Sequence, residues 1–185
     1  MQRTKTKNGP TRNRIFLLSP AYAGGRRAQM ILSDRARFDL ARKLRSESGA
    51  TIGEVFTFLS GLYFRGKIAY ANAFARSTNG GSGVFVITPT RGLVEAHSII
   101  TASDLREFAG VDIDEQNLRY RKPLEKSVRS LAKELSADCD VILLGSIATG
   151  KYVDVFLRHF GERLRVFVRS AGGYGLQITP NSARS

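Results

Sequence analysis

Residues 141–160 read VILLGSIATGKYVDVFLRHF, which predicts a buried strand, a glycine-containing loop and an amphipathic helix. Gly145, Gly150 and Lys151 have the spacing of the phosphate-binding loop of nucleoside triphosphatases. Tyr152, however, stands where that loop needs a Ser or Thr to hold magnesium. We therefore expect no triphosphate hydrolysis. Backbone N–H groups and Lys151 can still face another anion at the start of the helix, or Lys151 simply extends into solvent.

Two earlier apolar runs end in a similar way. Residues 15–18 are followed by Ser19 and Pro20, and the strand VFVIT of residues 84–88 is followed by Pro89. Because helical patterns separate these strands, the sequence predicts one α/β domain with three α/β/α layers and a mostly parallel, open, Rossmann-like sheet. Such sheets bind ligands at the carboxyl ends of their strands, so we expect the site there.

Between the predicted strands, apolar residues recur at helical spacing, which predicts helices there. Residues 28–44 fit one helix, or two helices with Ser33 or Asp34 as the second cap. Thr51 and Glu54 have the spacing of a capping box. A capped turn or short helix is predicted over residues 99–108, and a helix over residues 123–135.

The chain is strongly basic, with 29 Lys and Arg against 16 Asp and Glu in 185 residues and a formal charge of +13. Such a field concentrates polyanions, which makes nucleic acid, and DNA in particular, the expected partner. The alternatives are a charge kept for solubility, a ribosomal partner or an anionic membrane surface. The oligomeric state stays open.

We expect a cytoplasmic protein without membrane segments, because no apolar run approaches the about 20 residues of a membrane span. Residues 1–14 are basic and almost free of apolar side chains, which predicts a flexible arm that lies along phosphates or remains solvated. The single domain is expected over residues 15–178, with a tail over 179–185. Cys139 is expected to be a small packing residue.

Residues 53–76 interleave aromatic and basic side chains. Tyr63 and its neighbours alternate with Arg65 and Lys67, a mixture that can stack bases and hold phosphates. The competing interpretation is an amphipathic helix whose aromatic residues enter the core.

Four blocks carry a resemblance: FLLSPAYAGGRRAQ, EVFTFLSGLYFRGKIAYANAFA, VITPTRGLV and DVILLGSIATGKYVDVF. They resemble an uncharacterised bacterial family over most of residues 15–160. The order of these motifs also resembles YaaA-like proteins and the uracil-DNA glycosylase-like domain of archaeal tRNA-modifying enzymes. The resemblance implies a nucleic-acid-binding α/β domain, and in the glycosylase case a pocket for an extruded base.

The chain departs from uracil-DNA glycosylases at two places. Those enzymes carry Asp or Asn after the first strand and His in a late loop, where this chain has Ser19–Tyr22 and Ser146–Thr149. A conventional mechanism is therefore not transferred.

Cleavage of an N-glycosidic bond needs a carboxylate near the cationic sugar, a placed water and a group that meets charge on the departing base. The catalytic candidates are Asp154, Glu54 and Lys67, with Glu95 and Asp104 as further carboxylates. Each carboxylate has a structural alternative as a cap or solvated side chain. Lys67 and Lys151 are candidate phosphate clamps, or amine nucleophiles if the pKa is depressed.

The candidate substrate-binding residues are Ser19, Pro20, Tyr22, Tyr63, Arg65, Arg91, Gly92, Gly145, Ser146, Thr149 and Lys151. We expect no cofactor and no metal, because no Cys, His or carboxylate cluster has metal-ligand spacing.

The sequence leaves three functions open. The first is a DNA glycosylase-like, base-processing enzyme; the others are a nucleic-acid-binding protein without catalysis and an enzyme acting on a small nucleotide or nucleoside. A base-sized cavity walled by Tyr22 or Tyr63 favours an enzyme, whereas a flat basic face favours binding alone.

Overall fold

The computed structural model describes residues 12–77, 81–145, 151–170 and 173–178. Its main sheet has six strands, in the spatial order β4 (Gly92–Glu95), β3 (Val84–Thr88), β1 (Arg14–Leu18), β6 (Asp140–Leu144), β7 (Leu164–Ser170) and β8 (Gly173–Ile178). The four central strands are parallel, and β4 and β8 pair antiparallel at the edges. The predicted mostly parallel sheet is confirmed.

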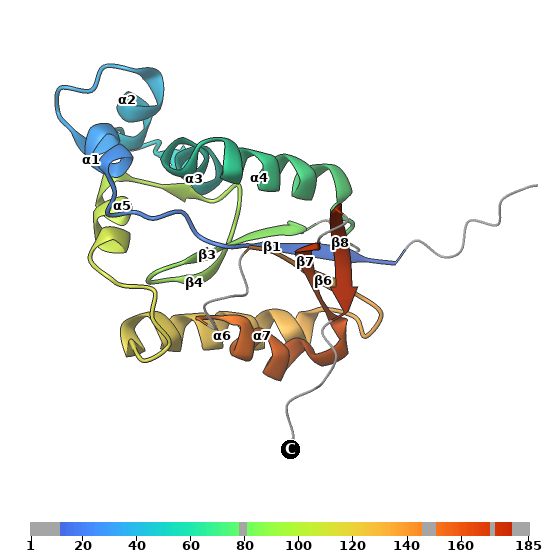
Figure 1. Cartoon of the computed structure of the whole chain (residues 1–185). Helices are drawn as coiled ribbons and strands as arrows, with labels where there is room; N and C mark the ends of the chain where they lie inside the picture. The colour runs from blue at the N-terminus through green and yellow to red at the C-terminus, as the bar shows by residue number, and fades with distance from the viewer. Residues whose placement is uncertain (1–11, 78–80, 146–150, 171–172, 179–185) are drawn as a thin grey trace, which may run out of the picture.

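Helices cover both faces of this sheet (Figure 1). One face carries α3 (Ile52–Ser60) and α4 (Leu62–Phe74), and the other carries α6 (Leu118–Glu134) and α7 (Val153–Phe160). The expected three-layer α/β/α architecture is therefore confirmed.

The central strand β1 is apolar on both faces, as a parallel strand between two helix layers requires. Phe16 and Leu18 belong to the core under α3 and α4, whereas Ile15 and Leu17 belong to the core over α6 and α7. All four side chains are almost completely buried. The strand begins at Arg14, inside the predicted basic arm, because Arg14 pairs with Asp140 of β6.

The strand order reverses at β1. The chain leaves β1 to form helices on one face and then β3, whereas it leaves the β3–β4 hairpin to reach α6 on the opposite face. The neighbouring strand β6 is followed by α7 on that opposite face, so the segments that follow β1 and β6 separate at the carboxyl edge of the sheet. This is the place where open α/β sheets form ligand crevices.

Residues 28–44 form two helices, α1 (Arg26–Leu32) and α2 (Asp39–Arg45). The two-helix alternative is correct, but neither Ser33 nor Asp34 caps the second helix, because α2 begins after Phe38. Arg45 donates hydrogen bonds to the backbone oxygens of Ser33 and Ala36, at 2.9 and 2.6 Å, and so holds the connection between the helices.

The aromatic-basic segment is also divided into two helices. Gly61 separates α3 from α4 with a φ of 64°, a conformation that favours glycine. At the start of α3, Thr51 and Glu54 form the predicted capping box. Phe64 is fully buried, as the amphipathic interpretation expects, whereas Tyr63, Tyr70 and Phe74 remain partly or largely exposed.

The remaining elements complete the edges of the molecule. A two-stranded sheet pairs β2 (Ala50–Thr51) with β5 (Ile99–Ile100), and α5 (Ala102–Ala109) follows with a second capping box from Thr101 and Asp104. Helix α6 follows the Asn117 cap and begins at Leu118, five residues before the predicted start, so that Pro123 lies in its second turn. A 3₁₀ turn (Gly161–Arg163) leads from α7 to β7. Cys139 is buried, as expected of a packing residue.

Tyr120 of α6 gives a prediction about the core. Its side chain is fully buried, and its hydroxyl has no hydrogen-bond partner among the described residues. Because an unsatisfied buried hydroxyl costs free energy, Tyr120→Phe should leave the free energy of unfolding unchanged or raise it by about 1 kcal/mol. Urea unfolding measures this change, with Tyr22→Phe as the exposed control. A clear loss of stability in Tyr120→Phe would reveal a partner for the hydroxyl.

Candidate active site at the carboxyl edge of the sheet

A cavity of about 670 Å³ opens at the carboxyl ends of β1, β3 and β6. The loop after β1 contributes Ser19, Pro20 and Tyr22, and α4 contributes Tyr63 from its first turn. Both tyrosines are exposed, at 77% for Tyr22 and 63% for Tyr63, and therefore present ring surface to solvent. Sequence reasoning predicted all four of these residues.

Further lining residues come from the end of α5 and from the connection between α5 and α6. Phe108 and Val111 are buried there, whereas Asp112 and Asp114 are exposed and line the cavity. The Asp114 carboxylate accepts a hydrogen bond from the Gln116 backbone N–H at 2.8 Å and so shapes the turn. Asp112, in contrast, makes no ion pair or side-chain hydrogen bond within the described residues. Of the two acidic side chains on the cavity lining, Asp112 is therefore the one whose carboxylate has no partner within the described residues.

Sequence reasoning missed Asp112 and Asp114. The segment GVDIDE is the densest acidic stretch in a basic chain, and this contrast is the one signal that could have indicated them. No motif spacing connects them to the strand ends.

Ser19, Lys67 and Tyr152 meet behind the loop that follows β1. The Lys67 Nζ lies 2.6 Å from Ser19 Oγ and 3.2 Å from Ser19 O. The Tyr152 hydroxyl also hydrogen bonds with Ser19. Ser19 and Tyr152 are both cavity-lining residues that are less than 10% exposed. Three segments distant in the sequence thus form one polar cluster at the cavity wall.

Lys67 packs against aromatic rings instead of a carboxylate. Its Nζ lies 4.7 Å from the centre of the Tyr63 ring and 5.1 Å from that of Phe64. Burial lowers the pKa of Lys67 from 10.5 to about 8, because the charged ammonium loses hydration. The sequence made a lowered pKa the condition for an amine nucleophile, and Lys67 meets this condition.

This pKa predicts how stability depends on pH. The pKa of Lys67 is about 8 in the folded chain and about 10.5 in the unfolded chain, so burial of the charged ammonium lowers the free energy of unfolding at low pH. This destabilisation disappears as the pH rises from about 8 to about 10.5. Relative to Lys67→Met, the free energy of unfolding of wild type should therefore rise between pH 7.5 and about pH 10. Urea unfolding of both proteins at the two pH values measures it. A difference that does not change with pH contradicts the burial of a charge at Lys67.

Gly145 approaches this cluster at the end of β6. A Cβ at this position would lie 2.5 Å from Ser19 Cβ and 3.2 Å from the Tyr152 hydroxyl oxygen. These distances leave no room for a side chain, so the glycine allows the ends of β1 and β6 to meet. Gly145 therefore positions Ser19, a role that the sequence-based assignment to substrate binding did not foresee.

Lys151 lines the cavity and is partly exposed, and Tyr152 follows it as the cap residue of α7. The predicted substrate-binding residues Ser146 and Thr149 lie outside the described residues. Lys151 is therefore the residue of the opening motif that the structure brings to the cavity.

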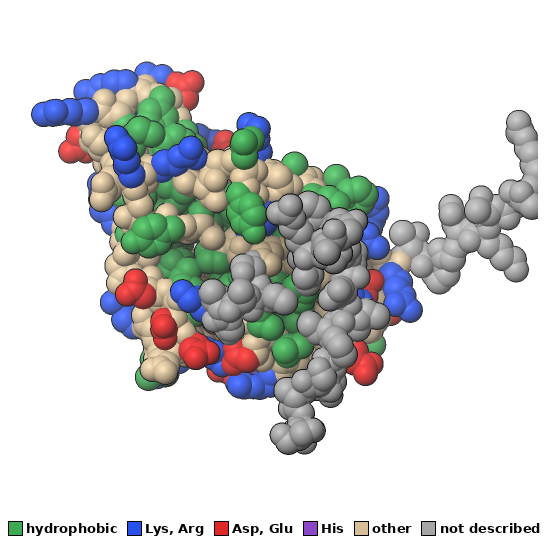
Figure 2. Space-filling model, viewed as in Figure 1, with side chains coloured by type: hydrophobic (Ala, Val, Ile, Leu, Met, Phe, Trp, Pro, Cys, Tyr) green, Lys and Arg blue, Asp and Glu red, His purple; other side chains and the backbone are tan. Residues whose placement is uncertain are grey.

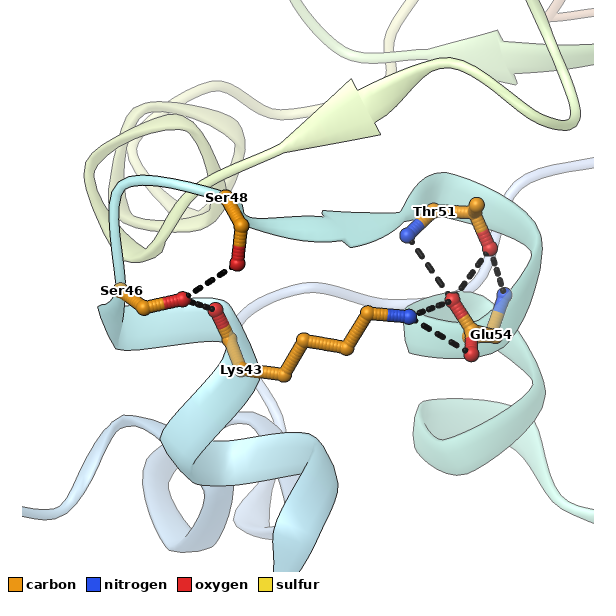
Figure 3. Close-up of polar contacts among 5 residues, drawn as sticks. All are labelled: Lys43, Ser46, Ser48, Thr51 and Glu54. Atoms are coloured by element: carbon orange, nitrogen blue, oxygen red, sulfur yellow. Dashed lines mark hydrogen bonds and ion pairs between the residues drawn. The ribbon is translucent and has the colours of Figure 1, made fainter.

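Glu54 does not line this cavity, and its carboxylate has structural partners (Figure 3). Its carboxylate accepts hydrogen bonds from the Thr51 backbone N–H at 3.0 Å and the Thr51 hydroxyl at 2.7 Å, and it pairs with Lys43 at 3.1 Å. The Thr51 hydrogen bonds hold the pKa of Glu54 below its usual value. The structure thus shows Glu54 in the helix-cap role that sequence reasoning offered as its alternative, and its predicted catalytic role has no support from the strand-edge cavity.

Asp154 also serves a structural purpose. It lies in the first turn of α7, where its carboxylate pairs with Arg121 of α6 and approaches Arg158 at 3.9 Å. It does not line the cavity at the strand ends. The ion pair joins α6 to α7, and the strand-edge cavity gives no support to the predicted catalytic role of Asp154.

The other predicted residues lie outside the cavity. Arg91 pairs with Asp104 and Glu107 of α5, and Gly92 packs against α6, where a Cβ would lie 2.4 Å from the Pro123 oxygen. Arg65 is exposed on α4 without lining the cavity, and Glu95 pairs with His97 at 2.9 Å. The structure thus assigns packing or surface positions to these residues.

No family model, curated protein or solved structure matches this chain. In the described parts of the chain, no helix is long and apolar enough to cross a membrane. The functional conclusion therefore depends on the geometry of the cavity.

Proposed function

We propose that this chain is a DNA-binding enzyme of the glycosylase type, which cleaves the N-glycosidic bond of a nucleotide extruded into the strand-edge cavity. The observation that carries the proposal is a cavity of about 670 Å³ walled by Tyr22 and Tyr63, with Ser19 and Asp112 on its lining. This volume is within the usual range for small-molecule sites and accommodates a nucleoside.

Recognition of the base would come from the two exposed tyrosines. Base-processing enzymes remove their target from the helical stack and hold it between aromatic or apolar side chains. Stacking of a base on an aromatic ring is worth about 1–3 kcal/mol, which offsets part of the cost of extrusion. Because every base has an aromatic face, these rings do not determine which base is removed.

The charges around the cavity support the same substrate. Lys and Arg side chains gather at the end of the molecule formed by α1 and α2, and Asp and Glu side chains lie near the start of α6 (Figure 2). The exposed arginines of the basic surface are Arg26, Arg27, Arg35, Arg37 and Arg42. Phosphates would bind the basic side and Lys151, while the sugar of the extruded nucleotide faces Asp112.

The chemistry assigns a separate role to each side of the cavity. As the glycosidic bond breaks, positive charge develops on the sugar, and the Asp112 carboxylate stabilises it or orients the attacking water. The Ser19 hydroxyl, held by Lys67 and Tyr152, faces the cavity as a hydrogen-bonding group for the nucleotide. The resemblance to YaaA-like proteins and glycosylase-like domains is consistent with this assignment.

Abasic-site formation tests the proposal. Duplex and single-stranded oligonucleotides containing normal, uracil, alkylated or hypermodified bases are incubated with the protein and then cleaved with alkali. Wild type should convert at least one substrate into a strand break, and Tyr63→Ala should slow this conversion at least tenfold. Tyr70→Ala, on the same helix but outside the cavity, is the matched control.

Salt-dependent DNA binding without release of any base would indicate a nucleic-acid-binding protein without catalysis. Cleavage of free nucleosides with no activity on oligonucleotides would instead favour a small-molecule enzyme. Either result contradicts the proposed function.

A further inference from the structure

We propose that Lys67 is an amine nucleophile that forms an imine with C1′ of the abasic sugar, so that the enzyme holds its product covalently. This inference rests on the proposed function, because it requires a nucleotide sugar in the same cavity. It adds a covalent step and an activity on DNA that is already abasic.

The position of Lys67 is the first observation. Its Nζ contacts two groups of the cavity wall, the Ser19 hydroxyl at 2.6 Å and the Tyr63 ring at 4.7 Å. Lys67 does not itself line the cavity, but both of these contacts are with residues that do, so the amine lies behind the lining. A sugar beside Ser19 would therefore meet the amine when the Ser19 hydroxyl turns aside.

The absence of a counter-charge is the second observation. Within the described residues, Lys67 makes no ion pair, whereas Lys43, on the neighbouring helix α2, pairs with Glu54 at 3.1 Å. Its hydrogen-bonding partners are the neutral hydroxyl and carbonyl of Ser19. A lysine in this setting loses its proton far more readily than a paired one, and only the neutral amine is a nucleophile.

Burial also increases the share of neutral amine near neutral pH. Because it lowers the pKa of Lys67 to about 8, Lys67 is unprotonated far more often at this pH than a solvated lysine. An ordinary solvated lysine is unprotonated in fewer than about one in a thousand molecules at pH 7. Burial thus makes Lys67 a much more reactive amine than a surface lysine.

The covalent step is balanced without any further reactant. The abasic sugar opens to its aldehyde, and the lone pair of Lys67 Nζ adds to C1′ to form a C–N bond. Two protons pass from nitrogen to the former carbonyl oxygen, the C1′–O bond breaks and water leaves, which yields the C=N bond. Addition of water reverses the sequence and releases the sugar. No oxidation or reduction occurs.

Borohydride trapping tests this step directly. An oligonucleotide with one abasic site is incubated with the protein, and sodium borohydride is added to reduce the imine to a stable secondary amine. The expected product is a covalent adduct whose DNA maps to the peptide containing Lys67. Its yield should rise from pH 6 to pH 8.5 as the amine loses its proton.

Three variants separate chemistry from folding and charge. Lys67→Met and Lys67→Arg should each reduce trapping at least 100-fold, and the arginine variant retains the cation but cannot form the imine. Lys126→Met, which removes one exposed positive charge from α6, should trap normally. Trapping that persists in Lys67→Arg, or maps to the N-terminus or another lysine, overturns the inference.

The outcomes also distinguish this inference from the proposed function. Release of a base from intact DNA without any trapped adduct leaves the glycosylase function standing and excludes the imine. An adduct at Lys67 without base release from any substrate supports the imine and contradicts the glycosylase function. Absence of both results contradicts both.

Discussion

Gly145→Ala should lower the rate of base release at least 100-fold while the protein stays folded. The added Cβ would lie 2.5 Å from Ser19 Cβ and 2.7 Å from Ser19 Oγ, closer than unbonded atoms can approach. Ser19 would have to move, and the hydrogen bonds that it shares with Lys67 and Tyr152 would move with it. A displacement of about 1 Å in a catalytic site can cost about 100-fold in rate.

Gly66→Ala is the matched control, because a Cβ at Gly66 meets nothing within 4 Å on the same helix that carries Lys67. That variant should release bases at the wild-type rate and unfold at equal or higher urea concentration, since alanine favours helix. Normal activity in Gly145→Ala, measured by single-turnover kinetics, would show that the Ser19 cluster does not take part.

Asp112→Asn should reduce the single-turnover rate of base release by about 100-fold or more, with little loss of DNA affinity. The carboxylate is exposed on the cavity wall and has no ion pair within the described residues, so its charge is free to face a cationic sugar. Removal of a group that meets charge in the transition state costs about 100- to 1,000-fold in rate. The amide keeps the size of the side chain, removes its charge and replaces one acceptor oxygen by an NH2 donor.

Asp34→Asn provides the control, because Asp34 is exposed near α1 and lies outside the cavity. It removes the same charge from the same basic protein, so a general electrostatic effect on DNA binding would appear in both variants. Equal rates for Asp112→Asn and wild type would remove Asp112 from the mechanism. The carboxylate of Asp114 would then be the next residue to replace.

The central fold could be predicted because local pattern and tertiary structure agree there. The strands of residues 15–18, 84–88 and 141–144 are continuous apolar runs, as strands between two helix layers must be. The edge strands β4 and β8 and the inner strand β7 were not predicted. The short β4 lacks such a run, and polar residues interrupt the sequence of β7.

The site was predicted in part, for a related reason. Ser19 and Pro20 directly follow a recognisable strand, so the rule for parallel sheets places them at the correct edge. Asp112 follows a helix instead, and its place on the cavity wall depends on how the α5–α6 connection folds back. Periodicity within the sequence contains no information about such a packing arrangement.

Glu54 and Lys67 show what a local sequence pattern can and cannot indicate. The capping box of Thr51 and Glu54 was visible in the sequence, and it accounts for the carboxylate without catalysis. The burial of Lys67 behind Ser19 was not visible, because the two residues are 48 positions apart. A depressed pKa arises from tertiary structure and could be stated only as a condition.

Photochemical cross-linking tests most directly whether the cavity holds an extruded base. A DNA oligonucleotide with a single 5-iododeoxyuridine is irradiated in complex with the protein, and the cross-linked residue is identified by peptide mass analysis. The account predicts that Tyr22 or Tyr63 is cross-linked, with yield that falls when the site is blocked by an unmodified competitor. Cross-links confined to Tyr70 or Phe74, at the other end of α4, or to the α1–α2 surface would contradict it.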